Sequence, residues 1–472
     1  MTPLQVAARN LLRNRRRSLA TALTIAIGVV ALLLFGGYRT DLIHYMLTAF
    51  GRSIGHVLVQ HEDYLDYGSG NPALYSFKNA YAVRDALLAD PQLAPRIHVA
   101  TPVINFPAVA GHAERETSKT VLLNGVVPKE HSRMRAWNYY GVNLPSGPHP
   151  LDGKPPDAAL LGVGTARILQ VCDVLPHEAR CGAQKTRSVT QPVEQAGETR
   201  SDLLDLAELE QGERQTAGPR IDPARAIEVL AATTRGVPNV RSFEVIAAEY
   251  HGVKDVDESY VVVDYEHARE LLFGRGSSEA SSIAIVLRNP NDVDAVMKRA
   301  DQVLSERFPG QRLVARNAEE AAPFIRQTID MFNMLFRFIS VLILAIVMFT
   351  VANTVRTSIM ERTIEIGTIR ALGLRRSTVL GLFLIEAALL AFAGAVLGTA
   401  IAALCSLGIN ALGLRWIPPN AAEYMPLTVA VLGQYQTMAT IVVAATIFST
   451  LAALPAASKA ARLNIVEALR HV

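Results

Sequence analysis

Residues 356–374 read RTSIMERTIEIGTIRALGL and lie between two long apolar runs of the chain. Three arginines and two glutamates are spaced along this stretch, and two more arginines follow it directly. A loop of about twenty residues between two membrane spans stays on the cytoplasmic side when it is rich in arginine. The stretch therefore predicts the orientation of the chain, provided that the runs on either side cross a membrane.

Four apolar runs are long enough to cross the hydrocarbon layer of a bilayer, which takes about 20 helical residues. Half of the 472 residues are hydrophobic, a share that soluble proteins also reach, so clustering rather than composition decides the class. Backbone groups in lipid must bond within their own segment, and each run is therefore expected to be a helix. The runs are Leu19–Gly37, Phe338–Val355, Val379–Leu407 and Thr437–Leu454.

The arginines are unevenly distributed around these runs. Arg13 and Arg15–Arg17 precede the first run, five arginines follow the second, and Lys459, Arg462 and Arg470 follow the fourth, whereas the loop after the third run holds one. This pattern predicts a multi-pass protein of the bacterial inner membrane with both termini in the cytoplasm. Because Phe35–Tyr38 offers no A-x-A-like cleavage site, the first run is expected to remain as an uncleaved anchor.

The predicted fold class is an α-helical membrane protein with four transmembrane helices and a large extracytoplasmic α+β domain between helices 1 and 2. The expected segments are a cytoplasmic amphipathic helix (1–17), the first span (18–38), the periplasmic domain (39–327) with a mobile insertion (about 176–223), the second span with a stalk extension (328–355), a charged cytoplasmic loop (356–376), the third span (377–407), a short external loop (408–433), the fourth span (434–454) and a cytoplasmic tail (455–472).

Short β-branched runs alternate with helical patterns in residues 39–327, which indicates a mixed sheet covered by helices. A helix from about Ala318 is expected to continue unbroken into the second span and to tie the domain to the membrane. The expected strands are Ile54–His61, Ile97–Val103, Thr120–Asn124, Tyr260–Val263, Ile283–Leu287 and Arg312–Ala315, and the expected helices are Tyr81–Ala89, Glu266–Phe273 and Val293–Phe308.

Two of the three cysteines, Cys172 and Cys181, lie in this external segment with eight residues between them. In an oxidising compartment the spacing permits a disulfide, and two free thiols in an irregular loop are the alternative. His177 alone does not complete a zinc ligand set. Cys405 lies in the third span, and we expect its side chain only to pack against its neighbours.

Small residues predict close helix packing in the membrane. Ala22 and Ala26 lie one turn apart in the first span, and Gly394 and Gly398 form a GxxxG pattern in the third. The third span also contains Glu386, and a carboxylate inside a membrane is costly and is usually functional or paired. The sequence leaves two roles open for Glu386. It is either a functional group, or the partner of a cytoplasmic-side arginine or a helix-end amide.

The N-terminal residues Leu4, Ala7, Ala8, Leu11 and Leu12 follow helical spacing and predict a short amphipathic helix on the inner membrane face.

No motif for chemistry emerges from the sequence. It contains no G-x-x-x-x-G-K-[ST], no HExxH and no G-x-S-x-G. Gly162-Val-Gly164 lacks the third glycine of a dinucleotide loop, and the histidines show no metal-ligand spacing. We therefore expect a protein that is not an enzyme, binds no cofactor or metal directly and, with a net charge of only +3, has no nucleic-acid partner.

The charged stretch resembles a family signature. Glu361-Arg362-x-x-Glu365-Ile366-Gly367-x-x-Arg370-Ala371-Leu372-Gly373, followed by a span with Glu386 and Gly394, looks like that of the MacB/FtsX/LolE superfamily of ABC-transporter permeases. The tail from Pro455 to Arg470 and the order of one span, a large outer domain and three spans are also similar to that family. Arg9–Arg17 and Gly55-His56 most resemble the lipoprotein-release (LolC/LolE-like) branch.

The resemblance implies that residues 356–374 couple the chain to a separate ABC ATPase dimer, which carries the ATP and Mg²⁺. It implies a second permease chain, identical or homologous, packed through the small-residue face of the first span. Ile366, Ile369 and Leu372 are expected to enter a hydrophobic groove of the ATPase. The implied coupling residues are Glu361, Arg362, Glu365, Ile366, Gly367, Arg370, Ala371 and Gly373.

Three functions are compatible with this resemblance. The first is ATP-driven extraction of lipoproteins or other amphiphiles from the inner membrane, with a periplasmic carrier as a further partner. The second is MacB-like efflux of peptides or small molecules from the periplasm through an adaptor. The third is FtsX-like signalling to a cell-wall hydrolase. The large outer domain favours transport, and the N-terminal similarity favours lipoproteins.

Overall fold

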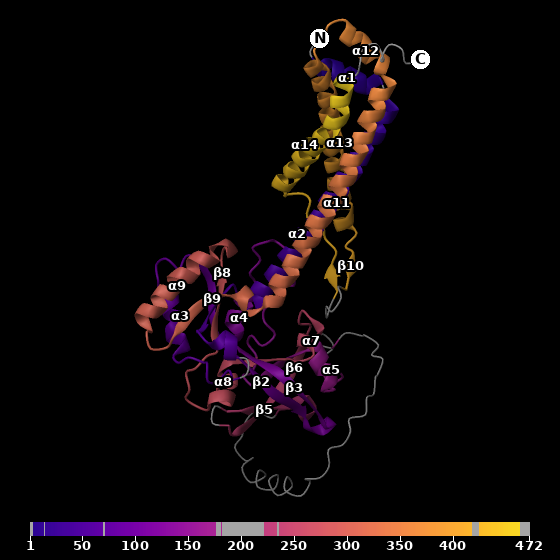
Figure 1. The fold of residues 1–472 in the computed structure, drawn as a ribbon. Coiled ribbons are helices and arrows are strands. Elements are labelled where there is room, and N and C mark those ends of the chain that lie inside the picture. The colour runs from indigo at the N-terminus through magenta and orange to yellow at the C-terminus, as the bar shows by residue number, and fades with distance from the viewer. Residues whose placement is uncertain are drawn as a thin grey trace, which may run out of the picture.

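The structure is a computed structural model that describes residues 3–13, 15–68, 71–175, 181, 221–233, 236–417 and 424–462. Figure 1 shows a helical bundle, a two-helix stalk and a sheet domain arranged in a row. Most of the predicted insertion 176–223 and residues 463–472 of the predicted tail lie outside the described residues.

Four helices of the described chain are long and apolar enough to cross a membrane, as the sequence predicts. The central one, α13, packs against α2 and α14, and α11 packs against the same two helices. The helices of the bundle are α1 (Pro3–Arg13), α2 (Arg15–Ser53), α11 (Pro323–Glu361), α12 (Thr363–Ala371), α13 (Arg376–Ala411) and α14 (Tyr435–Ala461).

The stalk arises because two membrane helices are longer than their apolar runs. We expected the first span to end at residue 38, but α2 continues without a break to Ser53. Gly36 and Gly37 let neighbouring segments pack closely against this part of α2, because a Cβ at either position would lie about 3 Å from Phe336 or from Val429 and Ala430. The segment from residue 38 to Ser53 therefore projects roughly 24 Å beyond the apolar run, at 1.5 Å per helical residue.

The second stalk helix begins later than predicted. The helix expected from Ala318 is divided into α10 (Ala318–Ala321) and α11, with Ala322 in a non-helical conformation between them. Pro323 is the physical reason, because a proline disfavours helical geometry in the residue before it and suits the first position of a new helix. From Pro323 onward, α11 runs unbroken into the membrane, as expected.

The described part of the domain contains one mixed sheet of nine strands in the order β3-β7-β4-β6-β5-β2-β8-β1-β9. The strand β2 is shared, since its first half pairs with β8 and its second half pairs with β3 and β5. The strands are β1 (Val57–His61), β2 (Ile97–His112), β3 (Thr117–Val126), β4 (Ala158–Gly162), β5 (Ala226–Ala232), β6 (Pro238–Glu249), β7 (Tyr260–Asp264), β8 (Ser282–Leu287) and β9 (Leu313–Asn317).

Pairing of β2 with β3 closes the strands β3, β7, β4, β6, β5 and β2 into a barrel. Leu123, Val261, Leu161, Phe243 and Val229 from five of these strands are fully buried in one apolar cluster. The remaining strands β8, β1 and β9 extend the sheet to one side of the barrel. The expected mixed sheet is therefore present, but its closure and the strands β4, β5 and β6 were not predicted.

Helices cover the sheet as expected, and α3 and α9 pack together on the open part, with α9 also against β9 and β1. The end of α2 is fixed to the domain by Arg52, whose guanidinium donates to the carbonyls of Trp137 (2.6 Å) and Pro145 (2.9 Å). The remaining helices are α3 (Ala80–Leu88), α4 (Pro128–Arg135), α5 (Val163–Ile168), α7 (Lys254–Asp257), α8 (Tyr265–Phe273) and α9 (Val293–Arg307).

The loop expected at 408–433 contains a short hairpin of β10 (Arg415–Trp416) and β11 (Met425–Pro426). It lies beside the stalk in Figure 1, and the backbone N–H of Ala430 donates to the carbonyl of Gly37 at 3.3 Å.

Candidate functional site

The stretch 356–374 forms a helical corner at one end of the bundle, beside α1 (Figure 1). Its first six residues complete α11, Arg362 interrupts the helix at φ −110° and ψ 21°, and α12 follows. Gly373 ends the corner with φ +95°, a conformation that a residue with a Cβ adopts only under strain. The predicted loop 356–376 is thus mostly helical, and its glycine at 373 makes the turn toward α13.

One side of the corner faces the interior of the bundle. Ile366 is only 5 % exposed and belongs to the apolar cluster that contains Ile359, Val379 and Phe383. Gly367 is also buried. The expectation that Ile366 contacts an ATPase groove is therefore wrong for this structure, because the side chain fixes α12 onto α11 and α13.

The other side of the corner is open. Leu372 is 79 % exposed, and Met360, Ile364 and Leu374 are also exposed apolar side chains. Among the predicted coupling residues, Glu361, Glu365, Ala371 and Gly373 are exposed and Arg370 is half-buried. The corner therefore presents an apolar surface edged by carboxylates.

A buried ion pair lies beneath the corner. The Arg362 Nη1 atom is 3.6 Å from the Glu386 Oε2 atom, and the two side chains are only 8 % and 14 % exposed. The carboxyl of Glu386 also accepts a hydrogen bond from the side chain of Asn10 in α1. The structure thus pairs Glu386 with an arginine, one of the two interpretations that the sequence left open.

A cleft surrounds this pair. It is lined by apolar side chains of α1, α11 and α13 and by polar groups of Ser18, Thr354 and Ser358. The Nε atom of Arg362 and the Oε2 atom of Glu386 are buried without a hydrogen-bond partner. Leaving such atoms unsatisfied is costly, so the Arg362–Glu386 attraction is the main compensation for burying both charges.

A second contact connects α1 to the corner at the surface. The Arg13 Nη2 atom lies 2.9 and 3.0 Å from the two carboxylate oxygens of Glu365. Both side chains are more than half exposed, so this pair contributes little stability. Neither Asn10 nor Arg13 was predicted as a site residue, because nothing in the local sequence connects them with residues 350 positions later.

The predicted small residues pack within the chain. A Cβ at Gly394 would lie 2.8 Å from the backbone oxygen of Ala22, and one at Gly398 would lie 2.6 Å from that of Ala26. The four residues therefore form one interface between α13 and α2, as GxxxG patterns do. The same face of α2 cannot also pack against a second chain, so that part of the predicted dimer arrangement is wrong for this structure.

Cys172 and Cys181 are joined by a disulfide, with their Cα atoms 5.5 Å apart. The bridge lies against the apolar core of the domain. Of the two arrangements that the sequence permits, the structure has the bonded one.

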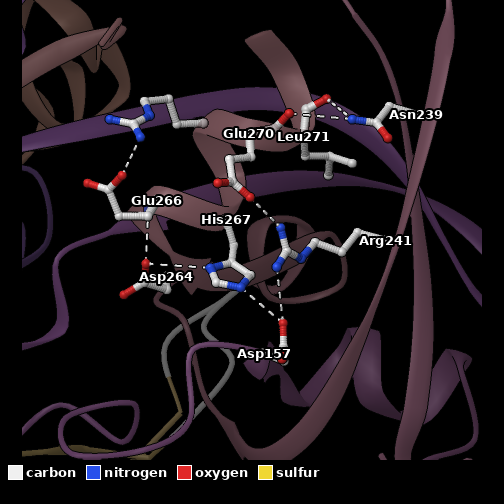
Figure 2. Close-up of polar contacts among 9 residues, drawn as sticks. Asp157, Asn239, Arg241, Asp264, Glu266, His267, Glu270 and Leu271 are labelled. Atoms are coloured by element: carbon white, nitrogen blue, oxygen red, sulfur yellow. Dashed lines mark hydrogen bonds and ion pairs between the residues drawn. The ribbon is translucent and has the colours of Figure 1, made fainter. Parts of the chain in front are cut away.

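The domain contains a cluster of polar side chains that pair with one another. Figure 2 shows Asp157 between Arg241 and His267, with the Asp157 Oδ1 atom 3.3 Å from Arg241 Nη2 and 3.0 Å from His267 Nε2. The Glu270 Oε2 atom lies 2.9 Å from the other terminal nitrogen of Arg241, Nη1. In the described residues no group of His, Cys, Asp and Glu side chains is arranged to hold a metal.

The Gly162-Val-Gly164 turn also has a structural role. The buried carboxylate of Asp257 accepts from the backbone N–H groups of Val163 (3.1 Å) and Gly164 (2.7 Å) at the start of α5. A Cβ at Gly162 would lie 2.0 Å from the Asp257 carbonyl oxygen. An internal carboxylate thus occupies the place that a phosphate takes in nucleotide loops.

Comparison with known proteins identifies the membrane part. Residues 337–465 match the family model described as FtsX-like permease C-terminal. The macrolide export ATP-binding/permease protein MacB of Escherichia coli is 31% identical over 137 residues, 29% of this chain and 21% of that protein. MacB of Neisseria gonorrhoeae is 28% identical over 135 residues, again 29% of this chain and 21% of the relative.

An uncharacterized ABC transporter permease of Methanocaldococcus jannaschii is 23% identical over 178 residues, 37% of this chain and 44% of that protein. The chain matches the MacB proteins over about a fifth of their length. The matched region contains the helical corner, Glu386 and the two glycines of the GxxxG pattern, Gly394 and Gly398. On these matches, residues 337–465 are an FtsX-like permease domain, and the chain is similar to permeases of the MacB/FtsX/LolE superfamily.

Proposed function

We propose that the chain is the non-catalytic permease subunit of an ABC transporter and transmits the force of a separate ATPase to its sheet domain. The observation that carries this proposal is α11, a helix of 39 residues that connects the corner to the domain without interruption. At 1.5 Å per residue it is roughly 58 Å long. A displacement of α12 therefore reaches the domain through a rigid element.

The orientation belongs to the same proposal. The end of the bundle that holds α1 and the corner is the arginine-rich end, with Arg13, Arg16, Arg356 and Arg375 near the ends of the membrane helices. Such an end remains in the cytoplasm. The stalk and the sheet domain then lie in the periplasm, where a disulfide such as Cys172–Cys181 is stable.

The open side of the corner is the proposed docking surface for an ABC ATPase dimer that binds ATP and Mg²⁺. Met360, Ile364 and Leu372 supply apolar anchors, and Glu361 and Glu365 lie at their edge. Arg362 and Ile366 act from inside by holding α12 in place. Two permease chains are proposed for each ATPase dimer, paired through surfaces other than Ala22 and Ala26.

Leu372→Asp tests the docking surface. A charge at the centre of an interface typically costs about 2 kcal/mol or more, which corresponds to roughly thirtyfold weaker association. We expect the tagged variant to lose the Walker-motif ATPase that co-purifies with the wild-type chain in detergent. Leu412→Asp is the matched control, because Leu412 is 71 % exposed at the opposite end of α13. Unchanged ATPase stoichiometry with Leu372→Asp would refute the docking role.

For the substrate, we propose lipid-anchored proteins or other amphiphiles drawn from the outer face of the inner membrane, with a periplasmic carrier as acceptor. The N-terminal resemblance to lipoprotein-release permeases supports this choice. The alternative is export of small molecules or peptides, which the matches to macrolide export proteins favour. Those matches cover 29% of this chain, and we propose that the sheet domain handles the substrate.

An assay in proteoliposomes that contain the chain and its ATPase distinguishes between the two proposed substrates. ATP-dependent release of a radiolabelled lipoprotein into the soluble fraction is the expected result. ATPase stimulation by a macrolide, without lipoprotein release, would instead establish export.

A further inference from the structure

Two arginines of neighbouring helices lie where the stalk enters the membrane. Arg337 of α11 precedes Arg356 by nineteen residues, roughly 28 Å of helix, which matches the thickness of the hydrocarbon layer. In α2, Arg39 lies about 34 Å along the helix axis from Arg16, at the same rise of 1.5 Å per residue. Both side chains are therefore level with the lipid headgroups on the side of the sheet domain.

The two guanidinium groups have no carboxylate partner. Within the described chain neither Arg39 nor Arg337 forms an ion pair, and the charge of Arg337 acts unfavourably on that of Arg39. The nearby carboxylate of Asp41 instead accepts a hydrogen bond from the Thr428 hydroxyl. Like charges on neighbouring helices repel each other, and an anion bound beside them would offset that repulsion.

Arg39 is held in place by an aromatic ring. Its guanidinium carbon lies 4.8 Å from the centre of the Phe336 ring, and Phe336 stacks in turn on Phe35 at 5.9 Å. The Nε atom of Arg39 is buried without a hydrogen-bond partner. An arginine stacked in this way retains its in-plane donors for an acceptor such as a phosphate.

An apolar stripe leads along α11 to the arginines. Met334, Phe338, Val341 and Phe349 are exposed at helical spacing, and Arg337 adjoins this stripe. In a bilayer these side chains contact acyl chains, so a lipid lying along the stripe has its headgroup beside Arg337 and Arg39.

We propose that Arg39 and Arg337 form a binding site for the phosphate of an anionic phospholipid, whose acyl chain lies along the exposed stripe of α11. The site differs from generic contact with the bilayer because two helices contribute donors to one headgroup and no protein carboxylate competes. A net negative headgroup offsets both arginines, whereas the ammonium of a zwitterionic lipid opposes them. The site is independent of the transported substrate and of the ATPase.

Electron spin resonance on the full chain in nanodiscs tests the site. Spin-labelled phosphatidylglycerol should associate with the wild-type protein more strongly than spin-labelled phosphatidylcholine. A cationic side chain near a membrane surface is worth about 1 kcal/mol toward an anionic lipid, or about fivefold in association. We therefore expect Arg39→Gln and Arg337→Gln each to lower the preference about fivefold, and the double variant to lower it further.

Two variants serve as controls for charge and for shape. Arg326→Gln removes the same charge from α11 roughly 16 Å beyond Arg337, outside the bilayer, and should leave the preference unchanged. Arg39→Lys keeps the positive charge but loses the planar guanidinium that stacks on the Phe336 ring. This variant should retain part of the preference for phosphatidylglycerol. An unchanged midpoint of thermal unfolding shows that the variants are folded.

Four outcomes would overturn the site. The preference could persist in the double variant, or Arg326→Gln could lower it equally. Excess inorganic phosphate could compete as well as the lipid, which would indicate a site for a free anion. The Phe338→Cys variant could cross-link to a second copy while no lipid is immobilised, which would show that a protein covers the stripe.

Discussion

The sheet domain and the membrane bundle are stabilised in different ways. The domain buries large apolar side chains such as Phe106, Phe243 and Tyr265, and buried charged groups such as Arg52 and Asp257 form hydrogen bonds with its backbone. The bundle relies on close contact between small residues and on a single buried ion pair, Arg362–Glu386, in its described part. Burial from water drives the first kind of packing but contributes little between helices in lipid.

Each region carries its own spectroscopic reporter. Trp137 lies in the core that joins the domain to the stalk, and Cys405 is a free, exposed cysteine in α13. With Trp416 replaced by Phe, tryptophan fluorescence follows the domain, and a fluorophore on Cys405 follows the bundle. The three predictions below use both signals in the full chain.

The largest effect is expected at the buried ion pair. Glu386→Gln leaves Arg362 buried without a counter-charge, and removing one partner of such a pair costs about 4 kcal/mol. The Cys405 signal should change at a much lower fraction of SDS, whereas the Trp137 signal should not. Arg13→Gln is the control, because the exposed Arg13–Glu365 pair is worth less than about 1 kcal/mol. Equal effects of Glu386→Gln and Arg13→Gln would contradict the prediction that the buried ion pair stabilises the bundle more than the exposed one.

Mild acid should weaken the domain and not the bundle. The His56 Nδ1 atom accepts the backbone N–H of Leu287 at 3.1 Å, and burial lowers the pKa of His56 from 6.5 to about 4. Burial likewise lowers the pKa of His131 to about 4 and that of His149 to about 3.

The direction follows from proton binding. Below pH 6.5 the unfolded chain takes up a proton that the folded chain accepts only near pH 4, so stability is lost across this window as the pH falls. His56 alone contributes about 2.5 kcal/mol of this loss at pH 4.5. Urea unfolding followed by Trp137 should show a smaller difference between pH 7 and pH 4.5 in His56→Gln. An identical difference in that variant would mean that His56 titrates normally.

The smallest of the three effects concerns helix packing. Gly398→Val places a side chain against the backbone of α2, which cannot move aside, and overpacking of this kind costs about 2 kcal/mol. Gly408→Val is the matched control in the same helix, because a Cβ there meets no atom within 4 Å. The Cys405 signal should separate the two variants. A bundle that tolerates Gly398→Val as well as Gly408→Val would show that α2 and α13 do not pack closely in the membrane.

The membrane elements could be predicted from the sequence because their signal is local. Eighteen or more apolar residues require a helix in lipid wherever they occur, so all four spans were found. Their ends were misjudged because a helix continues as long as neighbouring segments support it. The extension of α2 to Ser53 depends on Arg52 and on contacts with α4 and α11.

The domain was harder to predict because its strands are paired across long distances in the chain. The strand β5 has an alternating pattern, with Ile227, Val229 and Ala231 buried between exposed residues, and this signal could have been found. Closure of the barrel could not be predicted, because it depends on the pairing of β2 with both β3 and β5. No local pattern encodes such a choice of partners.

By itself, the sequence determined the number of spans, the position of the charged corner between two of them and the small residues that allow helices to approach. These properties follow from hydrophobic length, charge and side-chain size, which each residue carries wherever it is placed. The tertiary structure decided that Ile366 points inward while Leu372 is exposed, that Glu386 faces Arg362, and that the small face of α2 is used within the chain. Burial and pairing depend on surfaces supplied by distant segments, and only the folded chain brings those surfaces together.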